Sequence, residues 1–246
     1  MRGGEGPARV FLVIPAGGSG ARMGGGVPKQ FRDWGGVTLL EATLAAFFQP
    51  GMPALAGVAL AVPTDRLAEV RGWRLPVPLW VTEGGATRQA SVAQALALLP
   101  EAPEAAVLIH DGVRPFPPAG PVGEAIAALA TWDGAVLGEA STDTLKRVDP
   151  AGRILATEPR EGIFRAQTPQ VARLDTWRRA FAWARETGFQ GTDDVSLLEA
   201  QGLRVLLVPS PSTNLKLTTP EDWARWHPAA TACGGSAHTS RAGGKA

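Results

Sequence analysis

The sequence predicts an α/β fold with a mostly parallel sheet, helices on both faces and a protruding β-arm. Short apolar runs alternate with segments of helical periodicity, which is the pattern of a parallel sheet covered on both faces. Polar motifs follow several of the apolar runs directly, where ligands bind in such folds. The 246 residues suit one large domain, assigned here to residues 1–227 with the arm at about 141–161.

Several apolar runs are short enough to be buried strands. They are rich in valine, leucine, isoleucine and alanine. They lie at Val10–Pro15, Gly57–Pro63, Leu79–Thr82, Ala106–Ile109, Gly134–Leu137 and Arg204–Val208.

Segments of helical periodicity separate these runs. Thr38 is a good capping residue for a helix over Leu39–Phe48. Thr219, Pro220 and the two acids that follow have the pattern of a helix start. Further helices are expected at Thr87–Leu99, Pro121–Ala130, Leu174–Glu186 and Asp193–Gln201. From Pro228 onward, small polar residues predict a disordered tail over 228–246.

Residues 142–161 break this alternation. Two short strand-like segments, Thr144–Val148 and Ile154–Thr157, are joined by Asp149–Gly152, which has good turn chemistry. We interpret them as a hairpin that projects from the domain. A lone hairpin is marginally stable in water, so it should pack on something, and a partner subunit is one candidate.

Composition limits the classes of function. The net charge of +1 argues against a nucleic-acid partner but leaves room for a small anion site. No apolar run reaches the roughly 18–20 residues that cross a bilayer, and the N-terminus lacks a signal-peptide pattern. The one cysteine, Cys233, cannot form an internal disulfide. We therefore expect a reducing, cytoplasmic location and no membrane partner.

The first chemical motif is Pro15–Met23, which continues to Lys29 and Gln30. Its glycines allow backbone N–H groups to line a concavity that binds phosphate oxygens. Arg22 and Lys29 add positive charge at the two ends of the loop. Because the loop follows a predicted strand, phosphate binding is favoured over a plain surface loop. The motif lacks the Gly-Lys-Ser/Thr of a P-loop and the spacing of a dinucleotide fingerprint.

Two further motifs follow predicted strands. Gly84–Ser91 suits close contact with a base or ribose and places Arg88 on the same helix face as Ser91, although an ordinary helix start explains it equally well. Past the next strand, Asp111 is well placed to hold Mg²⁺ beside a triphosphate, and Arg114 to grip a phosphate. We interpret His110 as a structural hydrogen-bonding residue rather than an acid or base.

Taken in order, the motifs resemble the 2-C-methyl-D-erythritol 4-phosphate cytidylyltransferases of the non-mevalonate isoprenoid pathway. The resemblance covers about Val10–Trp223, through PAGGSGARM, PKQ, GGATRQAS, HDGVRP, DTLK, AQTPQ, TDDVS and NLKLTTPED. So many segments in one order are far more specific than a lone glycine loop. The resemblance implies a Rossmann-like fold, a homodimer joined by the β-arm and the use of Mg²⁺. It also implies transfer of CMP from CTP to an acceptor phosphate, by in-line attack on the α-phosphate.

The resemblance also implies roles for the matching residues. The residues that would bind CTP are Ala16, Gly17, Gly18, Gly85 and Ser91. The catalytic cations around the phosphates would be Arg22, Lys29 and Lys216, with Asp111 at the metal. The acceptor would be bound by Arg114, Thr144, Arg160, Thr168 and Thr192. Of these, Thr144 and Arg160 would reach across from the partner's arm.

Two alternatives stay open at this point. A cytidylyltransferase for another polyol phosphate, such as ribitol 5-phosphate, would share the CTP loop and differ on the acceptor side. A non-catalytic nucleotide-binding protein is disfavoured, because binding alone does not require Arg22, Lys29, Asp111 and Lys216 together.

Overall fold

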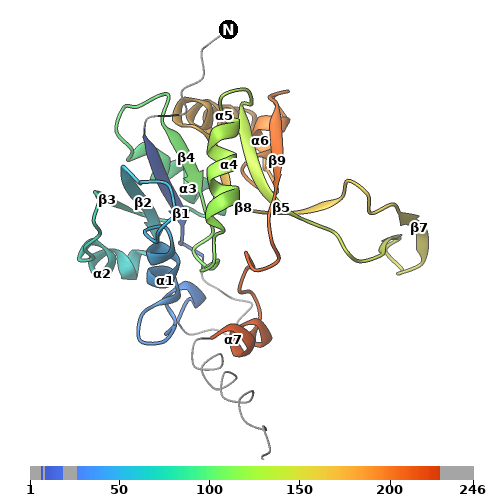
Figure 1. The fold of residues 1–246 in the computed structure, drawn as a ribbon, viewed down its shortest axis with the longest axis horizontal. Helices are drawn as coiled ribbons and strands as arrows, with labels where there is room; N and C mark the ends of the chain where they lie inside the picture. Colours follow the sequence, from blue (N-terminus) through green and yellow to red (C-terminus); the bar gives the residue numbers. More distant parts are fainter. Residues whose placement is uncertain (1–6, 8, 19–26, 228–246) are drawn as a thin grey trace, which may run out of the picture.

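A seven-stranded sheet forms the centre of the protein, in a computed structural model that describes residues 7, 9–18 and 27–227 (Figure 1). The strand order is β3-β2-β1-β4-β8-β5-β9, and all neighbours are parallel except that β8 runs antiparallel to β4 and β5. The expected mostly parallel α/β architecture is therefore confirmed. The strands are β1 (Val10–Pro15), β2 (Gly57–Val62), β3 (Leu79–Glu83), β4 (Ala106–Ile109), β5 (Gly134–Ala140), β8 (Phe164–Arg173) and β9 (Val205–Pro209).

Helices cover both faces of this sheet. One apolar core lies beneath α1 (Leu39–Ala46), α2 (Leu67–Arg71) and α4 (Ala119–Ala128). The other lies beneath α3 (Arg88–Ala97), α5 (Leu174–Thr187) and α6 (Ser196–Glu199). Successive side chains of strand β1 point to opposite faces of the sheet. Leu12 and Ile14 pack in the first core, and Phe11 and Val13 pack in the second. None of the helices in the described ranges is long and apolar enough to span a membrane.

The hairpin forms a separate two-stranded sheet that projects from the body beside β5 and β8 (Figure 1). It consists of β6 (Leu145–Val148) and β7 (Ile154–Glu158), which pair antiparallel. Three of its large apolar side chains, Val148, Ile154 and Leu155, are exposed, and Ile154 reaches 60% exposure. A surface of this kind on a two-stranded sheet is typical of an element that packs on another surface.

Strand β8 was not among the strands that the sequence predicts. Its centre carries polar side chains that are buried, namely Gln167, Thr168 and Gln170. Pro169 interrupts the strand pattern, and the pairing with β5 shifts register between Val136 and Gly138, opposite this stretch. The strand brings its polar residues between β4 and β5, next to the carboxyl end of β4.

Candidate active site

The carboxyl ends of the parallel strands carry the predicted motifs to one edge of the sheet. Ala16 continues β1 and Gly84 continues β3, while His110 and Asp111 continue β4. Two further segments reach the same edge from outside the sheet. They are the short 3-10 helix η2 (Lys29–Phe31) and the stretch before α7 (Pro220–Trp226).

Asp111 is the centre of a cluster of cations. The residue is 7% exposed, and its carboxylate lies 2.9 Å from Lys216 Nζ, 3.2 Å from Arg88 Nε and 3.4 Å from Arg114 Nε. Burial by itself would raise the pKa of Asp111, but the three cations outweigh it and hold the pKa well below its ordinary value. The carboxylate is therefore ionised and orients three basic side chains at the strand edge.

Arg88 links this cluster to a second buried carboxylate. Its Nη1 lies 2.8 Å from Asp194, which is 1% exposed and comes from the TDDVS motif. Burial raises the pKa of Asp194 to about 6, against the opposing effect of Arg88. The predicted site omitted both residues, because a helix start and a helix cap explain their motifs locally. The pair of acids in TDDVS was the one signal, since a cap needs only one of them.

A continuous chain of hydrogen bonds passes through the His110 side chain. The Asp111 N–H donates to Thr168 Oγ1 over 3.0 Å, and Thr168 Oγ1 lies 3.0 Å from His110 Nδ1. His110 Nε2 lies 3.0 Å from the carbonyl oxygen of Arg114. Burial lowers the pKa of His110 to about 4, so the ring is neutral, with its proton on Nε2 and its Nδ1 accepting from Thr168. This agrees with a structural role for the histidine.

The glycine loop is fixed by contacts that the sequence did not reveal. Gln30 Nε2 donates to the carbonyl oxygens of Ala16 and Gly18, over 2.6 and 2.8 Å, and so ties η2 to the loop. Gly17 packs against the turn after β3, where a Cβ on Gly17 would come within 2.9 Å of Gly84 Cα. At this position glycine is needed for close approach of two backbones. Arg22 lies outside the described residues.

On the other side of the loop, Ser91 shapes the turn at Gly85. The Gly85 N–H donates to Ser91 Oγ over 3.0 Å, and the same hydroxyl donates to the Thr87 carbonyl oxygen over 3.0 Å. Ser91 is buried, and it fixes the backbone that faces the glycine loop.

Lys29 contacts the short stretch of backbone to which Lys216 belongs. Lys29 Nζ donates to the carbonyl oxygen of Leu217 over 3.2 Å, next to Lys216. A polar cavity of about 590 Å³ opens beside Lys216. Its lining includes the basic residues Arg114, Arg165, Lys216 and Arg225, together with Glu139 and Asp222. An excess of cations of this kind suits a ligand that carries phosphate.

Two of the predicted acceptor residues, Thr144 and Arg160, lie on the arm, apart from this cluster within one chain (Figure 1). Thr144 and Arg160 are exposed at the base of the arm, where Arg160 Nη1 donates to the Thr142 carbonyl oxygen over 2.7 Å. Thr192 is exposed beside Asp193. Their predicted roles in acceptor binding stay predictions.

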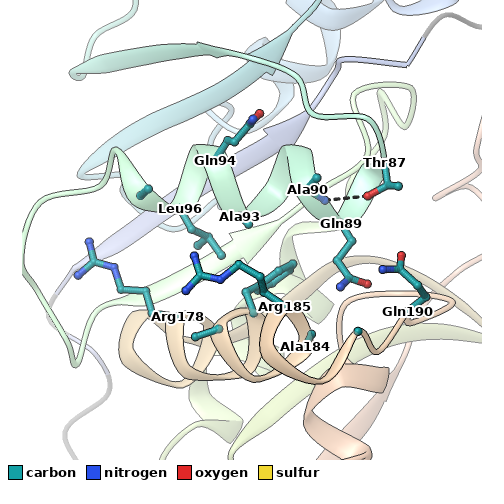
Figure 2. A pocket seen from close by; sticks show the side chains of 14 residues that line it. Thr87, Gln89, Ala90, Ala93, Gln94, Leu96, Arg178, Ala184, Arg185 and Gln190 are labelled. Atoms are coloured by element: carbon teal, nitrogen blue, oxygen red, sulfur yellow. Dashed lines mark hydrogen bonds between the residues drawn. The ribbon is translucent and has the colours of Figure 1, made fainter.

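A second cavity, of about 720 Å³, lies between α3 and α5 (Figure 2). Gln89 and Gln190 lie at one end, and Arg178 and Arg185 extend along α5. None of the site residues predicted from the sequence lines it. The cavity is therefore distinct from the charged cluster at the strand ends.

The donors near Asp111 limit the metal that the site can hold. Within the described ranges, no three histidine, cysteine or acidic side chains are grouped for metal binding. Asp111 supplies one carboxylate, and Mg²⁺ is commonly bound by one or two carboxylates together with substrate phosphates. The residues thus fit an ion that is shared with a nucleotide.

These features define a class of protein. A mostly parallel α/β sheet that gathers Lys216, Arg88 and Arg114 around one carboxylate at the carboxyl ends of its strands has the features of an enzyme that acts on phosphate groups.

Comparisons with known proteins identify the family. A family model for 2-C-methyl-D-erythritol 4-phosphate cytidylyltransferase matches residues 10–229. The chain is 40% identical over 226 residues to the Acidobacterium capsulatum protein of that name, covering 87% of this chain and 94% of that protein. The fold is similar to the crystal structure of the Thermus thermophilus enzyme of that name, at 36% identity and TM-score 0.71, covering 89% of this chain and 98% of that one. For the Francisella tularensis enzyme the values are 27% and 0.76, with 89% and 100% covered.

The chain therefore belongs to the 2-C-methyl-D-erythritol 4-phosphate cytidylyltransferase family. It is an enzyme of the nucleotidyltransferase class.

Proposed function

We propose that the cluster around Asp111 catalyses the reaction of the family. CTP and 2-C-methyl-D-erythritol 4-phosphate give 4-diphosphocytidyl-2-C-methyl-D-erythritol and diphosphate. An oxygen of the acceptor phosphate attacks the α-phosphorus of CTP, and the bond from that phosphorus to the diphosphate oxygen breaks. The observation that carries the proposal is the group of Lys216, Arg88 and Arg114 around one ionised carboxylate at the end of β4.

Charge stabilisation supplies the chemistry in this proposal. Both reactants are anions, and negative charge grows on the α-phosphate oxygens in the transition state. Lys29 and Lys216, together with Arg22, neutralise that charge. A phosphate monoester is already largely ionised at neutral pH, so no general base is needed. This agrees with His110, whose ring is buried and occupied by structural hydrogen bonds.

The nucleotide lies along the glycine loop in this proposal. Backbone groups of Ala16, Gly17 and Gly18 hold the phosphates and ribose, and Gly85 and Ser91 lie near the cytosine. Gln30 supports the loop from below, because it occupies the Ala16 and Gly18 carbonyl oxygens. Asp111 would hold Mg²⁺ that arrives with CTP. The ion would offset charge on the triphosphate.

The acceptor site is built in part by a second copy of the chain. Arg114, Thr168 and Thr192 come from one subunit, and Thr144 and Arg160 come from the arm of its mate. Two observations support a homodimer joined by the arm. The arm is a two-stranded sheet with exposed apolar side chains, and the two arm residues lie away from the charged cluster of their own chain.

Release of diphosphate from CTP tests the proposal. The acceptors to compare are 2-C-methyl-D-erythritol 4-phosphate, ribitol 5-phosphate and water alone. Release with the first acceptor, at least about tenfold faster in kcat/KM than with the second, is expected. A preference for ribitol 5-phosphate would support the alternative cytidylyltransferase. No release with any polyol phosphate would support a binding protein.

A further inference from the structure

Trp34 is a buried residue at the centre of a group of aromatic side chains beside the active site, and we call it the hub of that group. It is 5% exposed and lies in the loop that follows η2. Its ring centroid lies 5.1 Å from that of Trp223, 5.3 Å from that of His227 and 6.5 Å from that of Phe116. The interplanar angles of 80°, 72° and 60° are those of edge-to-face and tilted pairs, which are favourable arrangements.

Each of these rings belongs to a segment that carries a residue of the site. Trp34 follows Lys29, and Phe116 follows Asp111 and Arg114. Trp223 and His227 lie at α7, directly after the stretch that carries Lys216. None of these stretches belongs to a strand of the central sheet. Packing on Trp34 therefore helps to join them, together with hydrogen bonds such as that from the Leu217 N–H to the Val113 carbonyl oxygen.

Apolar packing and hydrogen bonds together connect Trp34 to both lysines. Leu217 packs in one buried cluster with Trp34, Leu39 and Val113. Its N–H donates to the Val113 carbonyl oxygen over 3.0 Å, and its own carbonyl oxygen accepts from Lys29 Nζ over 3.2 Å. Its neighbour Lys216 reaches Asp111 over 2.9 Å.

The link from Lys216 to α7 is stiff. Asp222 Oδ2 accepts from the N–H groups of Thr218 and Thr219 over 2.8 and 2.9 Å, within a capping box. A shift of α7 relative to Trp34 would thus move the backbone at Leu217, and with it Lys216 and the partner of Lys29. Displacement of a catalytic group by about 1 Å can cost roughly 100-fold in rate.

We propose that Trp34 is a positioning residue that holds Lys29 and Lys216 in their relative places around the reacting phosphates. The inference rests on the proposed roles of the two lysines. It adds to them a residue that touches no substrate and acts through Leu217 and α7.

Steady-state kinetics and urea unfolding of the same purified variants test the inference. Trp34→Leu removes the hub, and Trp34→Phe keeps a ring there. Trp223→Leu removes a half-buried ring from α7 and leaves the sheet intact. Trp132→Leu is the matched control, since Trp132 is also half-buried but lies at the amino end of β5, where it packs on Arg204.

We expect kcat to fall at least about tenfold in Trp34→Leu and in Trp223→Leu, with KM for CTP changed less than about threefold. Trp34→Phe should recover most of the loss. Trp132→Leu should keep kcat within about twofold at a similar loss of stability. Unchanged kcat in folded Trp223→Leu, or an equal fall in the control, would overturn the inference.

A double-variant cycle separates this inference from the proposed function. In the Lys216→Ala background, Trp34→Leu or Trp223→Leu should cause a clearly smaller further loss of kcat than in the parent, because one of the two lysines through which the ring acts is already gone. Losses that multiply in full would refute the inference and leave the role of Lys216 standing. Normal turnover of Lys216→Ala alone would refute the role of Lys216, and the inference that rests on it.

Discussion

Replacing Asp194 by asparagine should give the protein a stability that rises steeply with pH between about pH 4 and 6. The prediction depends on two buried groups with opposite effects. Burial lowers the pKa of His110 from 6.5 to about 4. Between these values the unfolded histidine binds a proton and the folded one does not. His110 therefore makes the free energy of unfolding rise with pH, by at most about 1.4 kcal/mol per unit.

Asp194 has the reverse effect over nearly the same range. Burial raises its pKa from 3.8 to about 6. Between these values the folded carboxyl group keeps a proton that the unfolded one has lost. The stability that it contributes is complete below the unfolded pKa and is lost as pH rises through the folded pKa. Across about two pH units each group is worth about 3 kcal/mol, and the signs are opposite. The parent protein should therefore be nearly flat in this range.

In Asp194→Asn the falling contribution is gone and the histidine contribution remains. The free energy of unfolding should rise by roughly 3 kcal/mol from about pH 4 to pH 6. Asp111 does not alter this window, because its pKa is held well below the ordinary value and its stabilisation is lost only at lower pH.

Urea unfolding at about pH 4.5, 5.5 and 6.5 measures the effect. Asp175→Asn is the control, since Asp175 is an exposed aspartate in an ion pair with Arg179 on α5, and it should follow the parent curve. The reasoning is wrong if the curve of Asp194→Asn runs parallel to that of the parent across the range.

Three other outcomes are expected. Lys29→Ala should lower kcat by roughly 10²–10³ through loss of one preorganised donor, and near-normal turnover would remove Lys29 from the mechanism. Arg88→Ala leaves Asp194 buried without its cation, so urea unfolding near neutral pH should show a loss of about 3–5 kcal/mol, whereas a loss under about 1 kcal/mol would show that the pair is not a buried one. Arg160→Ala should raise KM for the acceptor and spare KM for CTP; a rise only in KM for CTP would contradict the assignment of the arm.

The sequence predicted the elements that depend on neighbouring residues. Thr38 and Thr219 each accept a hydrogen bond from the backbone at the start of the helix they were expected to cap. The apolar runs became strands within a few residues of the expected bounds. Periodicity and capping act over a few residues, so they can be recognised along the chain.

Strand β8 could not be found in this way. Its buried positions are polar and it contains a proline, so it lacks the pattern of a central strand. Its polar side chains are satisfied by distant groups. Gln170, for example, accepts from the N–H groups of Asp194 and Val195 over 2.8 and 2.9 Å. Only the placement of the strand between β4 and β5 supplies those partners.

The residues of the site can likewise be separated into those predicted from the sequence and those found only in the structure. Asp111, Arg114, Lys29 and Lys216 lie in motifs whose residue types and order were already visible in the sequence, because polar residues that follow buried strands meet at one edge of a parallel sheet. The tertiary structure alone decided that Arg88 bridges Asp111 and Asp194. It also decided that Gln30 ties down the glycine loop and that Trp34 joins the two lysine segments. These contacts join residues that lie far apart along the chain or on separate elements, and nothing local in the sequence records which distant group a buried side chain will meet.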